Sequence, residues 1–199
     1  KELATGNSVG LNYDWQVLQA EATFTTLATE SQGSILTIAP GFKFIIADTI
    51  WNRTKRLPIS GSITPEEWQT YKALGVSSPY PKYRVKGNLL RFIPVPVAGD
   101  SCYFEYQSKN WCADVTGVTT RSAWSVDTDI GLLDEDLMTD GLIWRWKHAK
   151  GLDYAEDFRI YQTTVTSAIA RDTEGPILNM GNMESRGTGI VIPIGSWNV

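Results

Sequence analysis

Hydrophobic positions recur at helical spacing in two consecutive segments near the carboxyl end of the chain. In the first segment, near 132–150, a second row of apolar positions widens the stripe, so the predicted helix is apolar on more than one side. The second segment follows Gly151 and continues to about Arg171 with one apolar face. The turn between them is short, which favours an antiparallel helical hairpin that forms part of a helix bundle. The apolar positions are Leu133, Leu137, Met138, Gly141, Leu142, Trp144, His148 and Ala149, followed by Tyr154, Phe158, Tyr161, Val165, Ala168 and Ile169.

Capping signals mark the starts of two predicted helices. Thr64 is followed by Pro65 and by Glu67 three residues later, which is the pattern of a capping box and predicts a short helix over 64–75. Asp153 and Glu156 have the same spacing and predict a second capping box at the start of the later helix of the hairpin.

Short β-strands are predicted before residue 122. Residues 15–27 and 35–39 are rich in β-branched and aromatic side chains and are expected to pair as a hairpin. Residues 42–54 predict one or two further strands. Residues 56–59 predict an edge strand, because Pro58 lacks the backbone donor that a central strand needs.

Two further segments predict strands by their turn and their alternation. Gly87-Asn88 favours the positive φ of a tight hairpin turn between 82–86 and a strand that starts at 89. Residues 101–108 alternate, which places Cys102, Phe104 and Tyr106 on one face, with Tyr103, Glu105 and Gln107 on the other.

These patterns predict an α+β fold in three parts. Residues 1–122 form a mainly β region, an antiparallel β-sheet or small β-sandwich with the helix at 64–75. Residues 123–172 form the helical hairpin, and 173–199 form an extended C-terminal arm that has many glycines and no helical period. The arm is expected to dock on a neighbouring surface through an apolar patch made of Ile190, Val191, Ile192, Pro193, Ile194 and Trp197.

Length and charge narrow the classes of function. A chain of 199 residues can bury a core without disulfides or metals. Its formal net charge is −4 and it has no long basic run, which argues against tight DNA binding through contacts to the phosphates. The longest apolar stretches are well short of the roughly 18 residues that cross a bilayer, so no membrane association is expected.

Candidate catalytic groups are few, and each has a structural explanation. His148 is the one histidine and falls in the apolar stripe near a helix end, and Cys102 lies in the middle of a strand, where a small core residue is expected. The densest acidic cluster is Asp134, Glu135, Asp136 and Asp140. It opposes the helix dipole, and its consecutive side chains point in different directions around the helix, so they do not converge on one ion. Nucleotide and zinc-protease motifs are missing from the sequence. We therefore predict a protein that is not an enzyme and has no cofactor or metal.

The chain has 8 tryptophans, and large aromatic residues serve cores, subunit interfaces and sugar-binding surfaces alike. Most are expected in cores and interfaces. The alternative is a carbohydrate-binding phage tail component, whose groove on a β scaffold would be lined by Trp51, Trp68, Tyr80, Tyr83, Trp111 and Trp124.

Three stretches resemble a known family. They are IIADTIWNRTKRLPISG at 45–61, LRFIPVPVAGDSCYFEYQSKNWC at 90–112, and LLDEDLMTDGLIWRWKHAKGLDYAEDFRIYQ at 132–162. They are similar to podovirus head-to-tail adaptor proteins of the tail tubular protein A class, over residues 13 to 172.

The resemblance implies a structural virion protein. Family members form a homo-oligomeric ring, typically of twelve copies, between the portal protein and the tail nozzle or tail tube protein, with a tail fibre as a further candidate partner. The genome passes through the ring without sequence-specific binding. The expected location is the head-tail junction of the virion, after assembly in the host cytoplasm.

A helix that is apolar on two sides suits packing against a neighbouring subunit as well as its own chain. The residues expected to contact another subunit or a partner are Leu137, Leu142, Trp144 and Trp146 of the hairpin, and the apolar patch of the arm at 190–194 and 197.

Overall fold

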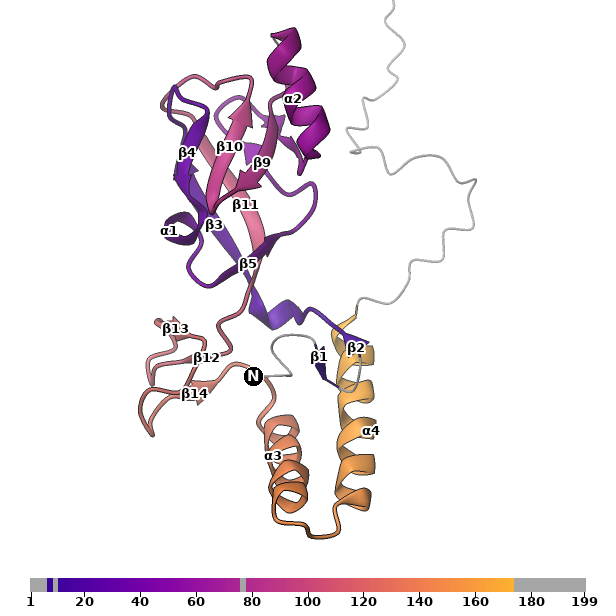
Figure 1. Cartoon of the computed structure of the whole chain (residues 1–199). Coiled ribbons are helices and arrows are strands. Elements are labelled where there is room, and N and C mark those ends of the chain that lie inside the picture. Colours follow the sequence, from indigo (N-terminus) through magenta and orange to yellow (C-terminus); the bar gives the residue numbers. More distant parts are fainter. Residues whose placement is uncertain (1–6, 9–10, 76–77, 174–199) are drawn as a thin grey trace, which may run out of the picture.

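The computed structural model describes residues 7–8, 11–75 and 78–173, with side chains from residue 13 onward. The chain is a mixed α+β protein in which nearly all strand pairs are antiparallel, which confirms the predicted α+β class. A β-rich part lies at one end and the pair α3 and α4 at the other (Figure 1). The elements are β1 (Asn7–Ser8), β2 (Leu11–Asn12), the 3₁₀ helix η1 (Gln16–Leu18), β3 (Gln19–Thr25), β4 (Ser31–Ser34), α1 (Ile35–Ile38), β5 (Phe42–Ile45), β6 (Trp51–Asn52), β7 (Leu57–Pro58), β8 (Ser60–Gly61), α2 (Pro65–Leu74), β9 (Lys82–Lys86), β10 (Leu89–Ile93), β11 (Ser101–Ser108), β12 (Cys112–Ala113), β13 (Thr120–Arg121), β14 (Ile130–Gly131), α3 (Glu135–Ala149) and α4 (Ala155–Asp172).

Two sheets of the β-rich part share one apolar core. One has the strand order β4-β10-β9-β8, and the other has the order β3-β11-β6-β7 with β5 also paired to β11. Leu90 and Phe92 from the first sheet and Phe104 from the second are fully buried. Phe24 joins them, since its ring lies 5.8 Å from that of Phe92 and 6.1 Å from that of Phe104. We call this group the β core.

The strands expected around Gly87-Asn88 pair in the structure. Leu89 of β10 lies opposite Lys86 of β9, and the two turn residues have φ of 59° and 60°. Such values match the mirror-image turns that follow the right-handed twist of a hairpin. The strand β7, Leu57–Pro58, lies at the edge of its sheet and pairs with β6, which confirms the edge strand predicted from Pro58.

The predicted hairpin of 15–27 with 35–39 is wrong. The strand β3 pairs with β11, and residues 35–38 form a helical turn, α1, instead of a strand. Ile35 and Ala39 are fully buried and Ile38 packs beside them in the β core. A helical turn places these three positions on one face, whereas a strand would point Ile35 and Ile38 to opposite faces.

A second apolar cluster, the helical core, holds α3 and α4 together. Leu137 of α3 and Tyr161 and Val165 of α4 are buried there. Residues far away in the sequence complete it, because Trp15, Leu18, Trp111 and Cys112 pack in the same cluster.

The two predicted capping boxes have different outcomes. At α2 the Thr64 side chain accepts from the Glu67 backbone N–H and the Glu67 carboxylate accepts from the Thr64 N–H, which confirms the first. The second is wrong. Tyr154 is the N-cap of α4, and the Glu156 carboxylate pairs with Arg159 at 2.6 Å because the guanidinium is within reach one turn ahead.

Candidate interaction surfaces

An apolar strip on α3 is left uncovered in the described chain. Leu142, Ile143 and Trp146 are 70%, 41% and 55% exposed. Their spacing places them on one side of the helix, while Gly141 and Leu137 face α4 and the helical core. Hydrophobic side chains of this size are rarely grouped on a free helix face. We call these three residues the α3 strip.

The predicted interface residues divide between core and surface. Leu137 is 1% exposed and serves the helical core of its own chain. Trp144 is half-buried, and its ring lies 5.0 Å from that of Phe158 and 5.9 Å from that of Tyr161. Leu142 and Trp146 are exposed as an interface requires. The arm residues Ile190, Val191, Ile192, Pro193, Ile194 and Trp197 lie outside the described residues.

Two loops of the β-rich part form a second exposed apolar patch. Leu27, Val95 and Val97 are 50%, 54% and 63% exposed. The hydroxyl of Thr26 donates to the Val97 carbonyl at 2.6 Å, which holds the two loops together. The loops lie at the end of the β-rich part farthest from α3 and α4 (Figure 1). We call this group the loop patch.

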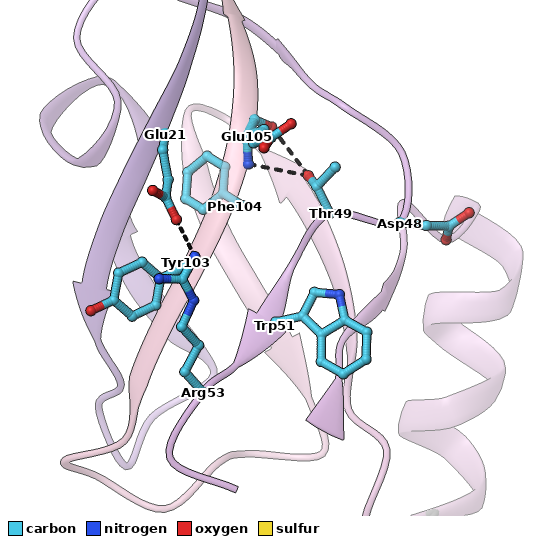
Figure 2. Close-up of a pocket in the computed structure, with 8 residues that line it drawn as sticks. All are labelled: Glu21, Asp48, Thr49, Trp51, Arg53, Tyr103, Phe104 and Glu105. Atoms are coloured by element: carbon cyan, nitrogen blue, oxygen red, sulfur yellow. Dashed lines mark hydrogen bonds and ion pairs between the residues drawn. The ribbon is translucent and has the colours of Figure 1, made fainter. Parts of the chain in front are cut away.

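A shallow pocket lies on the outward face of the sheet that contains β3, β11 and β6 (Figure 2). Strand register brings its side chains together: Glu21 of β3 lies directly opposite Glu105 of β11, and Trp51 of β6 lies opposite Tyr103 of β11. We call it the sheet pocket. It is lined by Glu21, Asp48, Thr49, Trp51, Arg53, Tyr103, Phe104 and Glu105.

One side of the sheet pocket is internally neutralised. The Arg53 guanidinium forms an ion pair with Glu21, and its Cζ lies 3.6 Å from the centroid of the Tyr103 ring. On the other side, the Glu105 backbone N–H donates to the Thr49 hydroxyl at 3.2 Å. Within the described residues the exposed carboxylate of Glu105 forms no ion pair.

The six aromatic residues of the predicted carbohydrate groove do not come together. Tyr83 is buried in the β core, Trp68 is buried on α2, and Trp111 is buried in the helical core. Trp124 packs edge-on against Trp111 at 5.1 Å, and Tyr80 is exposed in the loop before β9. Trp51 lines the sheet pocket.

The two candidate catalytic residues lie in different surroundings. Cys102 is fully buried, and burial, assisted by the Asp100 charge, raises the pKa of its thiol to about 12. His148 is exposed at the end of α3, with its ring edge-on to Tyr154 at 4.8 Å. In the described part of the chain, no three His, Cys, Asp or Glu side chains cluster as metal ligands would.

None of the helices in the described part has the length and apolar character of a membrane-spanning segment. A comparison with protein-family models found no match for the chain, and a search of curated proteins found none either.

Sequence reasoning did not identify the sheet pocket or the loop patch. The alternation of 101–108 placed Tyr103 and Glu105 on the outer face, which was a partial signal for the pocket. Their neighbours Glu21 and Trp51 come from strands remote in the sequence, and the pairing of those strands is decided by the fold.

Proposed function

We propose that this chain is a structural virion protein, the head-to-tail adaptor of a podovirus, which forms a ring of twelve copies between the portal and the tail nozzle or tail tube. The α3 strip carries this proposal. It is exposed although α3 already packs its other side against α4 in the helical core. A helix with two apolar sides is suited to a neighbour on each side.

Burial of the α3 strip would contribute substantially to association. Fully burying an exposed leucine or isoleucine side chain stabilises by roughly 1.5–3 kcal/mol, and each partly exposed side chain of the strip would contribute a share of this. In a ring, each subunit presents one surface to the next and a different surface to the previous one. The α3 strip supplies one such surface, and the hairpin of α3 and α4 would form part of a helix bundle with its neighbours.

The loop patch supports a bridging role. It lies at the far end of the β-rich part from the α3 strip, so the described chain carries apolar surfaces at two separated places (Figure 1). We assign the helical end to the ring and the portal, and the loop patch to the tail nozzle or tube, with a tail fibre as a further partner. DNA passes through the ring without sequence-specific contacts, and no catalysis is involved.

The test is ring formation on the portal encoded in the same genome. The wild-type chain should give ring-shaped density on the tail-facing end of the portal in negative-stain images. The double variant Leu142→Glu, Trp146→Glu should lose this density while keeping its circular dichroism spectrum. The reason is that two unpaired charges would have to be buried in the apolar contact between subunits.

A matched control places the same charge elsewhere. Val118 is 82% exposed in the turn between β12 and β13, and Val118→Glu should assemble like the wild type. Normal ring assembly by the α3 double variant would contradict the proposal, as would a wild-type chain that stays monomeric and does not bind the portal.

A further inference from the structure

We infer that the α3 strip of one copy packs on the outward side of α4 of the next copy in the ring. The inference rests on the proposed function for the ring itself. It adds the second surface of the contact and the direction in which the two helices meet. Figure 1 shows α3 and α4 side by side, so each helix has one side toward the other and one side turned away.

The outward side of α4 is exposed along its whole length. Tyr161 and Val165 occupy the inward side, where they are buried in the helical core. At about 100° per residue, a row of every third or fourth position from 156 to 171 falls on the opposite side of the helix. We call this row the α4 face, and all of its residues are exposed: Glu156, Ile160, Thr163, Ser167 and Arg171.

Small residues on the α4 face leave room for the large side chains of the α3 strip. Thr163 and Ser167 follow Ile160, which is 44% exposed and is the large apolar residue of the face. The Thr163 hydroxyl donates to the Arg159 carbonyl at 3.0 Å, so covering it costs no hydrogen bond. Helices pack when the side chains of one fill the spaces between the side chains of the other. The α4 face therefore offers Trp146 both an apolar contact and space.

Opposite charges lie at the two ends of the α3 strip. Glu135 is seven residues before Leu142, and Lys150 is four residues after Trp146. At helical spacing these four residues share one side of α3. Both charged groups are exposed, and neither forms an ion pair with another described residue. A surface that covers the strip is favoured if it carries a positive charge near Glu135 and a negative charge near Lys150.

The α4 face carries those charges at the same spacing. Glu156 lies 15 residues before Arg171. The two charges of α3 have the same separation, and each pair spans about 22 Å along its helix. Arg171 forms no ion pair with another described residue. Glu156 pairs with Arg159 at 2.6 Å, but both side chains are 67% exposed, and a carboxylate can accept from more than one cation.

Ring symmetry fixes the direction of the contact. Within one copy α3 and α4 are antiparallel, and Lys147 pairs with Asp157 at 2.6 Å across the turn between them. The copies of a ring are related by rotation, so every α3 has the same direction relative to the ring axis. The α4 of one copy is therefore also antiparallel to the α3 of its neighbour.

Antiparallel alignment brings each charge of α3 to an opposite charge on α4. Because the two spacings are equal, aligning one ion pair aligns the other, and the apolar residues lie between them. Exposed ion pairs contribute little to affinity, but they fix the register of a contact and disfavour the wrong one. The facing pairs are Glu135 with Arg171, Thr139 with Ser167, Leu142 with Thr163, Trp146 with Ile160, and Lys150 with Glu156.

The competing arrangement pairs two α3 strips about a twofold axis. It would also oppose Glu135 and Lys150, but it closes with two copies and does not extend to a ring. It would leave Ile160 and Arg171 uncovered as well. The α4 face is therefore the surface that suits a ring.

Cysteine crosslinking separates the two arrangements. Thr139→Cys and Ser167→Cys are placed in one chain, which is oxidised mildly after assembly on the portal. The two positions lie on opposite sides of their own hairpin, so a disulfide between them joins two copies. This paired variant should give a ladder of covalent multimers on a non-reducing gel, and each single variant should stay uncrosslinked. The native Cys102 and Cys112 are fully buried and should not react.

Leu142→Cys alone reports the competing arrangement, because the two copies of position 142 would meet near the twofold axis. It should stay uncrosslinked in the ring. A covalent dimer of Leu142→Cys, together with no ladder from the paired variant, would overturn the inference.

Charge reversal tests the register. Arg171→Glu and Glu135→Lys should each weaken assembly by about two- to fivefold, the range of a single exposed ion pair, and the two combined should restore it. Both substitutions oppose the helix dipole, so damage to the helices alone would add in the double variant instead of cancelling. Lys86→Glu, the same reversal at an exposed position of β9, should assemble like the wild type. A double variant that assembles no better than the single variants would contradict the contact.

The ring proposal and this inference fail separately. Rings on the portal without a ladder from the paired variant overturn the inference and leave the ring. A ladder longer than a dimer, without ring-shaped density on the portal, supports the helix contact and overturns the ring proposal. Absence of both overturns both.

Discussion

Gly141 of α3 lies against the ring of Tyr161 of α4, so closely that a Cβ at position 141 would stand 3.1 Å from Tyr161 Cε2. Tyr161 cannot easily retreat, because it is 4% exposed and packed in the helical core. The absence of a side chain at Gly141 is therefore what allows the two helices to approach. This contact leaves the α3 strip facing outward.

Enlarging Gly141 should separate the helices. Gly141→Leu is expected to destabilise the chain by about 1–3 kcal/mol through overpacking, as measured by urea unfolding. Gly141→Ala should be closer to neutral, because alanine gains roughly 1 kcal/mol of helix propensity against the tight contact. Thr139→Leu, at an exposed position of the same helix, should change the free energy of unfolding by less than about 0.5 kcal/mol. An unaltered stability in Gly141→Leu would show that the contact is looser than described.

Asp100 should make stability depend on acid pH. The Lys55 ammonium lies 2.9 Å from Asp100 Oδ2, and the Asn52 amide donates to the same oxygen at 2.8 Å. Lys55 first and Asn52 second hold the pKa of this buried carboxyl below its ordinary value of 3.8. A lowered pKa in the folded state stabilises above the unfolded pKa and loses that contribution as pH falls through the folded value. The free energy of unfolding should therefore decline below about pH 4.

The variant Asp100→Asn isolates that contribution. It should lower stability near pH 7 by about 1–2 kcal/mol, through loss of the charged hydrogen bonds, and reduce the acid decline. Urea unfolding at several pH values measures both effects. If the acid profile of Asp100→Asn superimposes on that of the wild type, Asp100 is not the group responsible.

Both cysteine thiols should be unreactive in the folded chain. Cys102 and Cys112 are fully buried, and burial raises the pKa of each, that of Cys102 to about 12. Thiolate is the reactive form, so a disulfide reagent such as DTNB at pH 8 should label neither residue in the native chain and both in guanidinium. Rapid labelling of native Cys102 would contradict its assignment as a core residue.

The Thr64 cap should stabilise α2 measurably. Thr64→Ala removes the acceptor for the Glu67 N–H and should cost about 0.5–2 kcal/mol in urea unfolding, because Trp68 couples the helix to the rest of the fold by its burial. Thr70→Ala is the control. Thr70 is exposed within the same helix and its hydroxyl bonds to its own helix at the Glu66 carbonyl, so its removal should be neutral or slightly stabilising. Equal effects of the two substitutions would exclude a special role for the cap.

Features that depend on neighbouring residues were predictable from the sequence. The capping box at Thr64, the turn at Gly87-Asn88 and the alternation of Cys102, Phe104 and Tyr106 all appear in the structure. Each rests on short-range geometry, since a cap, a tight turn and a pleat are settled within a few residues. The helices near 132–171 follow from apolar periodicity in the same way.

Tertiary structure decided the rest, because periodicity shows which positions are apolar and not what covers them. In the folded chain Leu137 is buried and Leu142 of the same helix is exposed. Ile35 lies in a helical turn, although its β-propensity favoured a strand. The fold also placed Glu21 opposite Glu105, although 83 intervening residues separate them in sequence. Pairing between remote strands depends on how the whole chain buries its apolar surface, and local residues alone do not contain that information.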